Sequence, residues 1–313
     1  MAHYGRYWMK TIKGILILFS LLFLVIGCGG DGKKGESVSI SISPVSAKIN
    51  AGGSVVLTVT VQNSTVIWPT SVSGKHVVNS DGTTAIYTPP LTAGTYRFTV
   101  RTADDGSKMA TASITVQPPG SPIPPPSGEM EVDIGNNPVL SNNSAKVVMV
   151  EFIDYECYYC RLYVRETFPS IQDQYVDTGK IQYAVMDYPL QTYSQKAAEA
   201  SHCAADQGKF WEMHKLMMEK PNLLSNPTSY AEPLELDEET FKKCLDDGKY
   251  VDAVFDDRVQ ALQAGVMGTP EFIIGVTDST DSKKIRSISR IRGAVSLSAF
   301  QQALDEAIDM NNP

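Results

Sequence analysis

The sequence has no excess of positive charge, which limits the partners that it can bind. Its 313 residues include 27 Lys and Arg against 35 Asp and Glu, so the formal net charge is −8 at pH 7. A protein that binds nucleic acid without sequence preference needs a basic face to meet the phosphates. The balance therefore argues against nucleic acid as a partner, while a hydrophobic content of 42% predicts a chain that can bury a sizeable core.

Cysteine and histidine are also scarce, with five and four residues. Three of the histidines, His76, His202 and His214, show no paired spacing, and the chain contains one Cys-x-x-Cys motif. A structural zinc site needs about four sulfur or nitrogen ligands, and haem attachment needs a histidine directly after the second cysteine of the motif. Too few paired ligands are present for a zinc site, and Arg161 stands where haem attachment needs a histidine. We therefore expect neither a metal site nor a bound cofactor.

An apolar run of membrane-spanning length is missing as well. The longest run covers the twelve residues 15–26, in which only Ser20 is polar, and it follows three basic residues with no acid among them. Twelve helical residues reach roughly 18 Å, which is short of the bilayer core of about 30 Å. The run therefore fits the apolar region of a secretory signal peptide.

The cysteine directly after this run adds a second signal. Residues 25–28 read Val-Ile-Gly-Cys, which resembles a bacterial lipobox, where the cysteine is lipidated and becomes the new N-terminus. We expect residues 1–27 to be a lipoprotein signal peptide and Cys28 to hold the protein on the extracytoplasmic side of a bacterial membrane, facing the periplasm or on the cell surface. An uncleaved signal anchor is the alternative. Disulfides persist in that oxidising compartment.

The next region has the alternation of β-strands. A polar, Gly-rich tether at 28–36 precedes it, and the region itself covers 37–117. Its alternating segments lie near residues 38–42, 55–61, 96–100 and 114–116. Short strands separated by turn residues predict an antiparallel sandwich. The stretches SVVLTVTV, GTTAIYTPP and AGTYRFTV, together with Trp68, resemble a bacterial Ig-like domain, which implies either a spacer or a binding module.

A proline-rich segment at 118–130 separates this region from the remainder, because six prolines favour an extended, semi-rigid linker. Residues 131–313 hold 29 acidic and 17 basic side chains, a net charge of −12. Their predicted elements are a strand at 147–153, a helix at about 157–176, a strand at 181–186, helices throughout 194–264, strands at 272–274 and 285–292, and a helix at about 296–309. The initial strand-helix-strand unit predicts parallel pairing.

This order resembles a thioredoxin fold with a helical insertion at about 194–264. The predicted fold class is therefore a multidomain chain, with an all-β Ig-like sandwich followed by an α/β thioredoxin fold.

The motif Cys157-Tyr158-Tyr159-Cys160 stands between the first strand and its helix. At a helix N-terminus, unpaired backbone N–H groups and the helix dipole stabilise a thiolate on Cys157. A thiolate is the attacking species in disulfide exchange. Cys160, one helical turn later, is expected to be more buried and to resolve the mixed disulfide. This position favours a redox pair over a zinc site or a structural disulfide.

The segment VEFIDYECYYC is similar to DsbA-like thiol–disulfide oxidoreductases, and the resemblance covers about 133–310. It implies that Glu151, six residues before the first cysteine, is a buried proton relay. It also implies that Thr269 and Pro270, within GVMGTPEFIIG, form a cis-proline loop that docks the substrate backbone opposite the cysteines. The alternatives are a salt-bridge residue at the strand edge and an ordinary trans turn.

Two further implications concern the motif's dipeptide and the remaining cysteines. Tyr158 and Tyr159 are expected to contact substrate. Some relatives carry a second bridge in the helical insertion, and an exported protein rarely keeps two free thiols. The resemblance therefore implies a structural disulfide between Cys203 and Cys244, with two buried, unpaired thiols as the alternative.

The charges beside the motif bear on the redox potential. Asp154 and Glu156 are expected to raise the pKa of Cys157, while Arg161 opposes them, and the two tyrosines add no charge. We therefore expect a thiolate that is less stabilised than in the strongest oxidants, and a milder potential.

The sequence as a whole predicts a membrane-tethered, extracytoplasmic thiol–disulfide oxidoreductase. Its expected partners are thiols and disulfides of exported proteins, the membrane through the N-terminal lipid, and a membrane redox partner that recycles the cysteine pair. The alternatives are a thiol reductase or isomerase, for example in cytochrome assembly, and a non-catalytic surface-binding lipoprotein.

Overall fold

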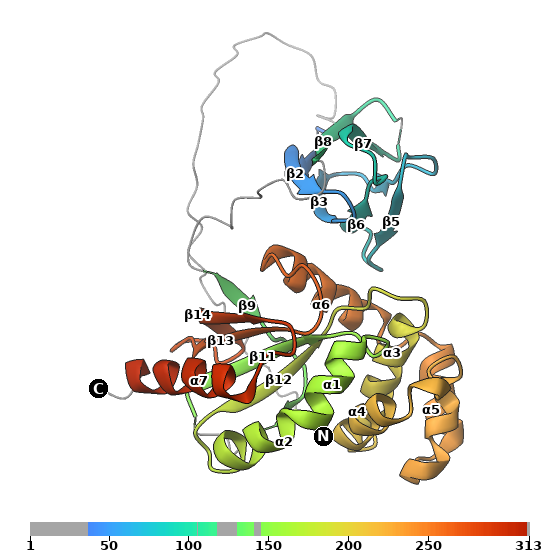
Figure 1. The fold of residues 1–313 in the computed structure, drawn as a ribbon. Helices are drawn as coiled ribbons and strands as arrows, with labels where there is room; N and C mark the ends of the chain where they lie inside the picture. The colour runs from blue at the N-terminus through green and yellow to red at the C-terminus, as the bar shows by residue number, and fades with distance from the viewer. Residues whose placement is uncertain (1–36, 105, 118–129, 141–144, 312–313) are drawn as a thin grey trace, which may run out of the picture. The chain divides into compact units, whose positions relative to one another are not determined.

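The structure is a computed structural model that describes residues 37–104, 106–117, 130–140 and 145–311 (Figure 1). The predicted signal peptide, the predicted lipidation site Cys28 and the tether lie outside the described residues, as does nearly all of the predicted proline-rich linker. No helix within the described ranges is both long and apolar enough to cross a membrane.

The first folded part consists of strands arranged in two four-stranded sheets. One sheet has the order β1-β3-β6-β5 and the other the order β2-β8-β7-β4. The strands are β1 (Ser39–Ser43), β2 (Ser46–Asn50), β3 (Val55–Gln62), β4 (Val66–Ile67), β5 (Lys75–Val78), β6 (Thr84–Thr88), β7 (Gly94–Thr102) and β8 (Met109–Gln117).

Alternate side chains of these strands build a shared core. Leu57 and Val59 of β3 are buried together with Phe98 and Val100 of β7, because successive residues of a strand face opposite sides of its sheet. One pairing differs from the antiparallel arrangement that the sequence predicts. Strand β2 runs parallel to β8, with Ile49 beside Val116, because the chain changes sheets between β1 and β2.

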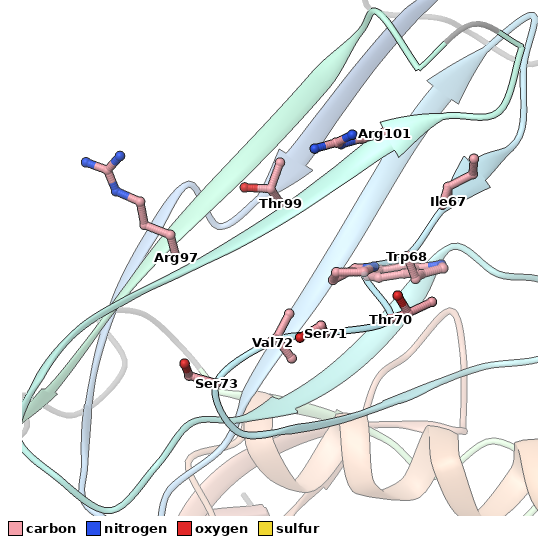
Figure 2. A pocket seen from close by; sticks show the side chains of 10 residues that line it. Ile67, Trp68, Thr70, Ser71, Val72, Ser73, Arg97, Thr99 and Arg101 are labelled. Atoms are coloured by element: carbon pink, nitrogen blue, oxygen red, sulfur yellow. The ribbon is translucent and has the colours of Figure 1, made fainter.

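A hollow lies against the face of β7 that points away from this core (Figure 2). Arg97, Thr99 and Arg101 follow one another at every second position of the strand, and Trp68 lies on the neighbouring segment. The indole N–H of Trp68 donates to the carbonyl oxygen of Gly82 at 2.8 Å, which fixes the ring. Neither arginine forms an ion pair within the described part of the chain.

The second folded part is built on one mixed sheet with the order β10-β12-β11-β13-β14-β9. The strands are β9 (Glu131–Asp133), β10 (Val139–Leu140), β11 (Val147–Ile153), β12 (Gln182–Asp187), β13 (Glu271–Thr277) and β14 (Lys284–Arg292). The predicted parallel pairing of the first unit is confirmed for β11 and β12, while β13 runs antiparallel to β11. Strand β11 therefore lies inside the sheet.

Helices cover both faces of this sheet (Figure 1). They are α1 (Tyr158–Glu166), α2 (Phe168–Ile171), α3 (Ser194–Ala205), α4 (Phe210–Glu219), α5 (Glu238–Asp246), α6 (Val251–Gln263) and α7 (Leu297–Asn311). Met149 and Ile153 of β11 pack on the side of α1 and α7, and Val150 and Phe152 pack on the side of α6. Every side chain of β11 is buried, as expected for a strand covered on both faces.

The helix predicted near 157–176 is interrupted. Helix α1 ends at Glu166, α2 begins at Phe168, and a π-helical turn follows at Gln172–Val176. Pro169 explains the break, because proline has no N–H to continue the ladder of α1 but fits the first turn of a new helix. The predicted helical insertion likewise divides into α3 to α6, with short 3-10 turns at Pro221–Leu223, Pro227–Tyr230 and Glu232–Leu234.

Candidate active site

The two cysteines of the motif occupy different environments at the start of α1. Cys157 is the N-terminal capping residue in an extended conformation, and its side chain is partly exposed. Cys160 lies one turn later and is fully buried. Both are free thiols in the structure. A partner could therefore reach Cys157 directly, whereas Cys160 can react only through Cys157.

Hydrogen bonds give Cys157 an acidic thiol. A hydrogen bond from Cys160 is the main cause that lowers the pKa of Cys157 to about 5, against the opposing effect of burial. Further hydrogen bonds from the side chain of Thr269 and from the backbone N–H groups of Tyr159 and Cys160 act in the same direction. The contribution of these helix N–H groups is the one that the position of the motif predicts.

Cys160 is shifted in the opposite direction. Burial raises the pKa of Cys160 well above its usual range, and the hydrogen bond to Cys157 and the charge of Glu151 raise it further. At neutral pH the pair therefore holds one thiolate and one neutral thiol. This is the division of roles that thiol–disulfide exchange requires, with an exposed nucleophile backed by a protected second thiol.

The two acids beside the motif do not set the pKa of Cys157, so the cause predicted from the sequence is wrong. The carboxylate of Asp154 accepts the backbone N–H of Leu190 at 2.7 Å, and that of Glu156 accepts the backbone N–H of Tyr193 at 2.6 Å. These bonds fasten the turn before α1 to the loop after β12. Arg161 likewise donates to the carbonyl oxygen of Glu156 at 2.8 Å.

Exposed apolar side chains surround the motif. The rings of Tyr158 and Tyr159 are each 59% exposed, with their centroids 5.4 Å apart. Leu190 and Tyr193 are exposed on the loop that is hydrogen-bonded to the turn before α1, and Met267 is exposed two residues before Thr269. The sequence identifies the two tyrosines of the motif but not the other three residues, because the hydrogen bonds that bring the 190–193 loop here have no sequence signature.

The loop before β13 faces Cys157. The Thr269–Pro270 peptide bond is cis, and the Cys157 thiol donates to the carbonyl oxygen of Thr269 at 3.2 Å. The carbonyl oxygen of Pro270 accepts the backbone N–H of Gly293 at 2.8 Å, so the loop is held by the end of β14. Both residues therefore lie where the resemblance places them, opposite the cysteines.

Glu151 is completely buried on the central strand β11. Its Oε2 accepts a hydrogen bond from the hydroxyl of Tyr183, while its Oε1 has no partner. Burial, the main cause, raises the pKa of Glu151 to about 8, although the Tyr183 hydrogen bond lowers it. Glu151 forms no ion pair with any described residue, so the alternative of a salt-bridge residue at a strand edge is wrong.

Cys203 of α3 and Cys244 of α5 form a disulfide in the structure, with an S–S distance of 1.97 Å and a Cα–Cα distance of 5.9 Å. The alternative of two unpaired thiols does not hold for these residues. The bridge joins two helices of the insertion and takes no part in the cysteine pair at α1.

A second buried group of titratable side chains has no signature in the sequence. Asp187, His202 and Asp257 come from β12, α3 and α6, and their ligand atoms lie within 4.8 Å of one another. Nε2 of His202 lies 2.9 Å from Oδ2 of Asp187, and Asp257 accepts the backbone N–H of Asp187 at 2.8 Å. Three such groups could hold a metal ion, but here they satisfy one another, so the cluster is explained as a structural link between three elements.

Comparison with known proteins gives a consistent picture for the second folded part. The family described as thioredoxin matches residues 134–291. The chain is 33% identical over 177 residues to the Na(+)/H(+) antiporter NhaA 3 of Salinispora tropica, a match that covers 55% of this chain and 26% of that protein. It is 26% identical over 163 residues to a Rickettsia typhi protein named as a protein-disulfide oxidoreductase, covering 50% of this chain and 60% of that one.

The chain thus spans between about a quarter and three fifths of the length of these curated relatives. Among solved structures it is similar to alpha-DsbA1 of Wolbachia pipientis, with 28% identity and a TM-score of 0.50. That match covers 56% of this chain and 92% of the other, so the likeness concerns the part built on the mixed sheet. This part has a DsbA-like arrangement of strands and helices.

Proposed function

This chain belongs to the thioredoxin family, and from that premise we propose that it is a protein thiol–disulfide oxidoreductase of the DsbA-like type. One observation carries the proposal: the partly exposed thiol of Cys157 has its pKa lowered to about 5, directly beside the neutral, buried thiol of Cys160. The names of the Rickettsia typhi relative and of the Wolbachia pipientis structure support the same reaction.

The exchange proceeds in two steps. The Cys157 thiolate attacks one sulfur of a substrate disulfide, the substrate S–S bond breaks, and its other sulfur leaves as a thiolate. Cys160 then loses its proton and attacks Sγ of Cys157, which releases the substrate's second thiolate and leaves a Cys157–Cys160 disulfide. Two electrons pass to the substrate in this direction, and the reverse sequence oxidises a substrate dithiol.

Glu151 supplies the proton acceptor for the second step. The pKa of the Cys160 thiol is raised by burial and by the charge of Glu151, so it needs a base within the core. Glu151, with its pKa raised to about 8 by burial, can take and return a proton near neutral pH. It is also fully shielded from solvent, and its charge acts on both cysteines.

The proposed substrates are exported polypeptides that bind in an extended conformation. Thr269, whose peptide bond to Pro270 is cis, presents its backbone beside Cys157, and an extended peptide can pair with such backbone groups. The exposed rings of Tyr158 and Tyr159 offer an apolar surface on the other side of the thiol. Folded, polar surfaces fit this site poorly, whereas unfolded segments with apolar residues near a cysteine fit it well.

The cellular setting is part of the proposal. We infer a signal peptide at 1–27, a lipid on Cys28 and a tether at 28–36, so that the enzyme acts outside the cytoplasm while attached to a membrane. The Cys203–Cys244 disulfide supports an oxidising compartment. The two-sheet part at 37–117 is proposed to be an Ig-like module that acts as a spacer. A membrane redox partner that recycles the cysteine pair completes the proposal.

Trapping of mixed disulfides tests the reaction and the two roles together. With Cys160→Ser, the mixed disulfide on Cys157 cannot be resolved, so covalent adducts with a substrate disulfide accumulate. With Cys157→Ser they do not, because the remaining thiol is buried and neutral. Non-reducing gel electrophoresis with mass spectrometry measures both. Equal trapping by the two variants, or no insulin-reducing or peptide-oxidising activity in the unaltered protein, would overturn the proposal.

A further inference from the structure

Two buried polar atoms lie unpartnered in the core beside the cysteine pair. They are Oε1 of Glu151 and the hydroxyl of Tyr163, and neither has a hydrogen-bond partner or contact with solvent. A buried polar atom without a partner costs free energy, so each one in a folded protein calls for an explanation. Both residues are completely buried, which excludes direct access to bulk water.

The sheet register and the helix period bring these groups together. Tyr163 follows Cys160 by three residues, so both lie on the inner face of α1. The ring of Tyr163 packs on Phe272 with centroids 4.5 Å apart, and Phe272 is the residue paired with Glu151 across β11 and β13. The hydroxyl of Tyr163 is therefore carried by a ring that packs on the direct neighbour of Glu151.

A second tyrosine reaches the same carboxyl from the other side. Val185 of β12 is paired with Glu151 in the parallel register, and Tyr183 stands two residues earlier on the same face of the sheet. Its hydroxyl donates to Oε2 of Glu151. The carboxyl group thus lies between α1, which carries Tyr163, and β12, which carries Tyr183. Of these two tyrosines, Tyr183 is hydrogen-bonded to it in the structure.

We propose that Tyr163 and Tyr183 are positioning residues that together hold the ionised carboxylate of Glu151, one hydroxyl on each oxygen. This inference rests on the proposed function and extends it from the proton relay Glu151 to the two tyrosine hydroxyls that stabilise its ionised form. An ionised carboxylate accepts hydrogen bonds through both oxygens, whereas the neutral acid accepts through its carbonyl oxygen and donates through its O–H group. In the structure the Tyr183 bond is made and the Tyr163 hydroxyl is free to make the second.

The consequence concerns the proton of Cys160. When the Cys160 thiol gives its proton to Glu151, the Cys160 thiolate is free to attack Sγ of Cys157 in the mixed disulfide, and the released substrate sulfur leaves as a thiolate. This step needs Glu151 to be ionised beforehand. Two hydroxyl donors make that state accessible in an apolar core, and removal of either donor keeps the carboxyl protonated to a higher pH.

Several titratable groups share this core and enter any titration of Glu151. The charge of Glu151 is coupled to Tyr155, Cys157, Cys160, Tyr163 and Tyr183. Measurement on the oxidised protein removes the two cysteines, because a disulfide does not titrate. The three tyrosines stay neutral throughout, since burial raises the pKa of each well above its usual range.

The test is the midpoint of the Glu151 carboxyl titration in the oxidised protein, with the residue identified by loss of its signal in Glu151→Gln. Carbon-13 nuclear magnetic resonance of glutamate-labelled protein provides the signal. Tyr163→Phe and Tyr183→Phe should each shift the proton affinity of Glu151 upward by about tenfold. Tyr175→Phe is the matched control, because its hydroxyl donates to Asp305 at 2.9 Å instead, and it should leave the midpoint unchanged.

An unchanged midpoint in Tyr163→Phe would overturn the role of Tyr163, since a purely structural ring would not move it. If that variant does not fold, the unaltered protein provides the test. As pH is varied, the ring chemical shift of Tyr163 should change at the same midpoint as the Glu151 carboxyl, and that of Tyr175 should not. Resolution of a preformed mixed disulfide at neutral pH should slow about tenfold in both variants. The carboxyl titration does not depend on turnover. Failure of the proposed function would appear as no disulfide exchange by the unaltered protein, and this result is distinct from an unchanged Glu151 midpoint in the variants.

Discussion

Cys157 and Cys160 show how two identical side chains acquire opposite acidity within one helical turn. Cys157 gains hydrogen bonds from Cys160, from Thr269 and from the first N–H groups of α1, so its pKa falls to about 5. Cys160 gains mainly burial, so its pKa rises. The helix N-terminus and the one-turn spacing predict the direction of this difference from the sequence, but not the hydrogen bonds from Cys160 and from the Thr269 side chain.

Glu151 makes the stability of the oxidised protein depend on pH. Burial, the main cause, raises the pKa of Glu151 from 4.5 to about 8 while both cysteines are free thiols, and the smaller contribution of the Cys157 charge is lost on oxidation. Burial alone still holds the pKa above 4.5, so above pH 4.5 the folded oxidised protein binds more protons than the unfolded chain. The free energy of unfolding should therefore fall as pH rises through this window, with Glu151 contributing about 1.4 kcal/mol per pH unit. Burial, the main cause, does not depend on the redox state of the cysteines.

The check is the difference in pH dependence between the unaltered protein and Glu151→Gln. Urea titrations of both oxidised proteins, between about pH 5 and pH 7.5, give the two slopes. Contributions of other groups, such as His202 and Asp257, cancel in the difference. The variant should show the shallower decline, and parallel slopes would show that Glu151 does not hold its proton in the folded state.

Asp154 gives a prediction that distinguishes its role in the structure, as an acceptor for the Leu190 N–H, from the effect on the Cys157 pKa expected from the sequence. Asp154→Asn removes the charge and one acceptor while keeping the size, and Leu190 N–H loses a partner that now lies at 2.7 Å. We expect the protein to lose about 1–3 kcal/mol of stability, whereas the midpoint of the Cys157 thiolate should stay within about half a unit, because Asp154 is not among the main causes of that pKa. Calorimetry and thiolate absorbance measure the two effects. A clear fall in the midpoint would restore the cause that the sequence suggested.

At the scale of elements, the sequence predicts best where one local signal dominates. The bounds of β11 are predicted at 147–153 and observed at Val147–Ile153, because an uninterrupted apolar run fits a strand covered on both faces. The break between α1 and α2 is missed, although Pro169 is its visible cause. The parallel pairing of β2 with β8 is missed because alternation predicts a strand but not the sheet that it joins.

The site divides in the same way. Glu151, the two cysteines and Pro270 lie in short sequence motifs, so the family resemblance identifies them as site residues. The loop with Leu190 and Tyr193 is held at the site by hydrogen bonds to Asp154 and Glu156, the two acids expected from the sequence to act on the thiol. The Asp187–His202–Asp257 cluster joins β12, α3 and α6, and no spacing along the chain reveals it.

The bridge between α3 and α5 gives the prediction at this scale. Cys203 and Cys244 are 41 residues apart, and a crosslink over such a loop stabilises the folded state by up to about 4 kcal/mol by restricting the unfolded chain. The double variant Cys203→Ala with Cys244→Ala should therefore unfold at lower denaturant concentration. Its Cys157 thiolate should titrate as before, because neither cysteine of the bridge is among the groups that set the pKa of Cys157. A shifted midpoint for Cys157 would instead show that the insertion positions the active site.

For the whole molecule, charge and redox poise are the properties to be tested. Residues 131–313 carry a net charge of −12, but the two acids closest to the motif are engaged by backbone N–H groups. The pKa of about 5 for Cys157 lies between the values of roughly 3.5 for a strongly oxidising relative and roughly 7 for thioredoxin. A less stabilised thiolate corresponds to a less oxidising pair.

The reduction potential should accordingly be more negative than about −120 mV and less negative than about −270 mV. Equilibration of the full chain with glutathione buffers of graded ratio, followed by alkylation and mass spectrometry, gives the value. A potential near the oxidising limit would contradict the milder poise. A potential near the reducing limit would favour the reductase or isomerase direction over net oxidation of substrates.

The thiolate of Cys157 is the feature on which the proposed chemistry depends, and its pH titration in the reduced full chain tests it most directly. Ultraviolet absorbance reports the thiolate, and the rate of reaction with a small disulfide, measured at the same pH values, reports its reactivity. We predict one midpoint near pH 5 in both, absent in Cys157→Ser. A midpoint near 9, the ordinary value of a cysteine thiol, or a reaction rate that does not follow the thiolate, would contradict the assignment of Cys157 as the activated nucleophile.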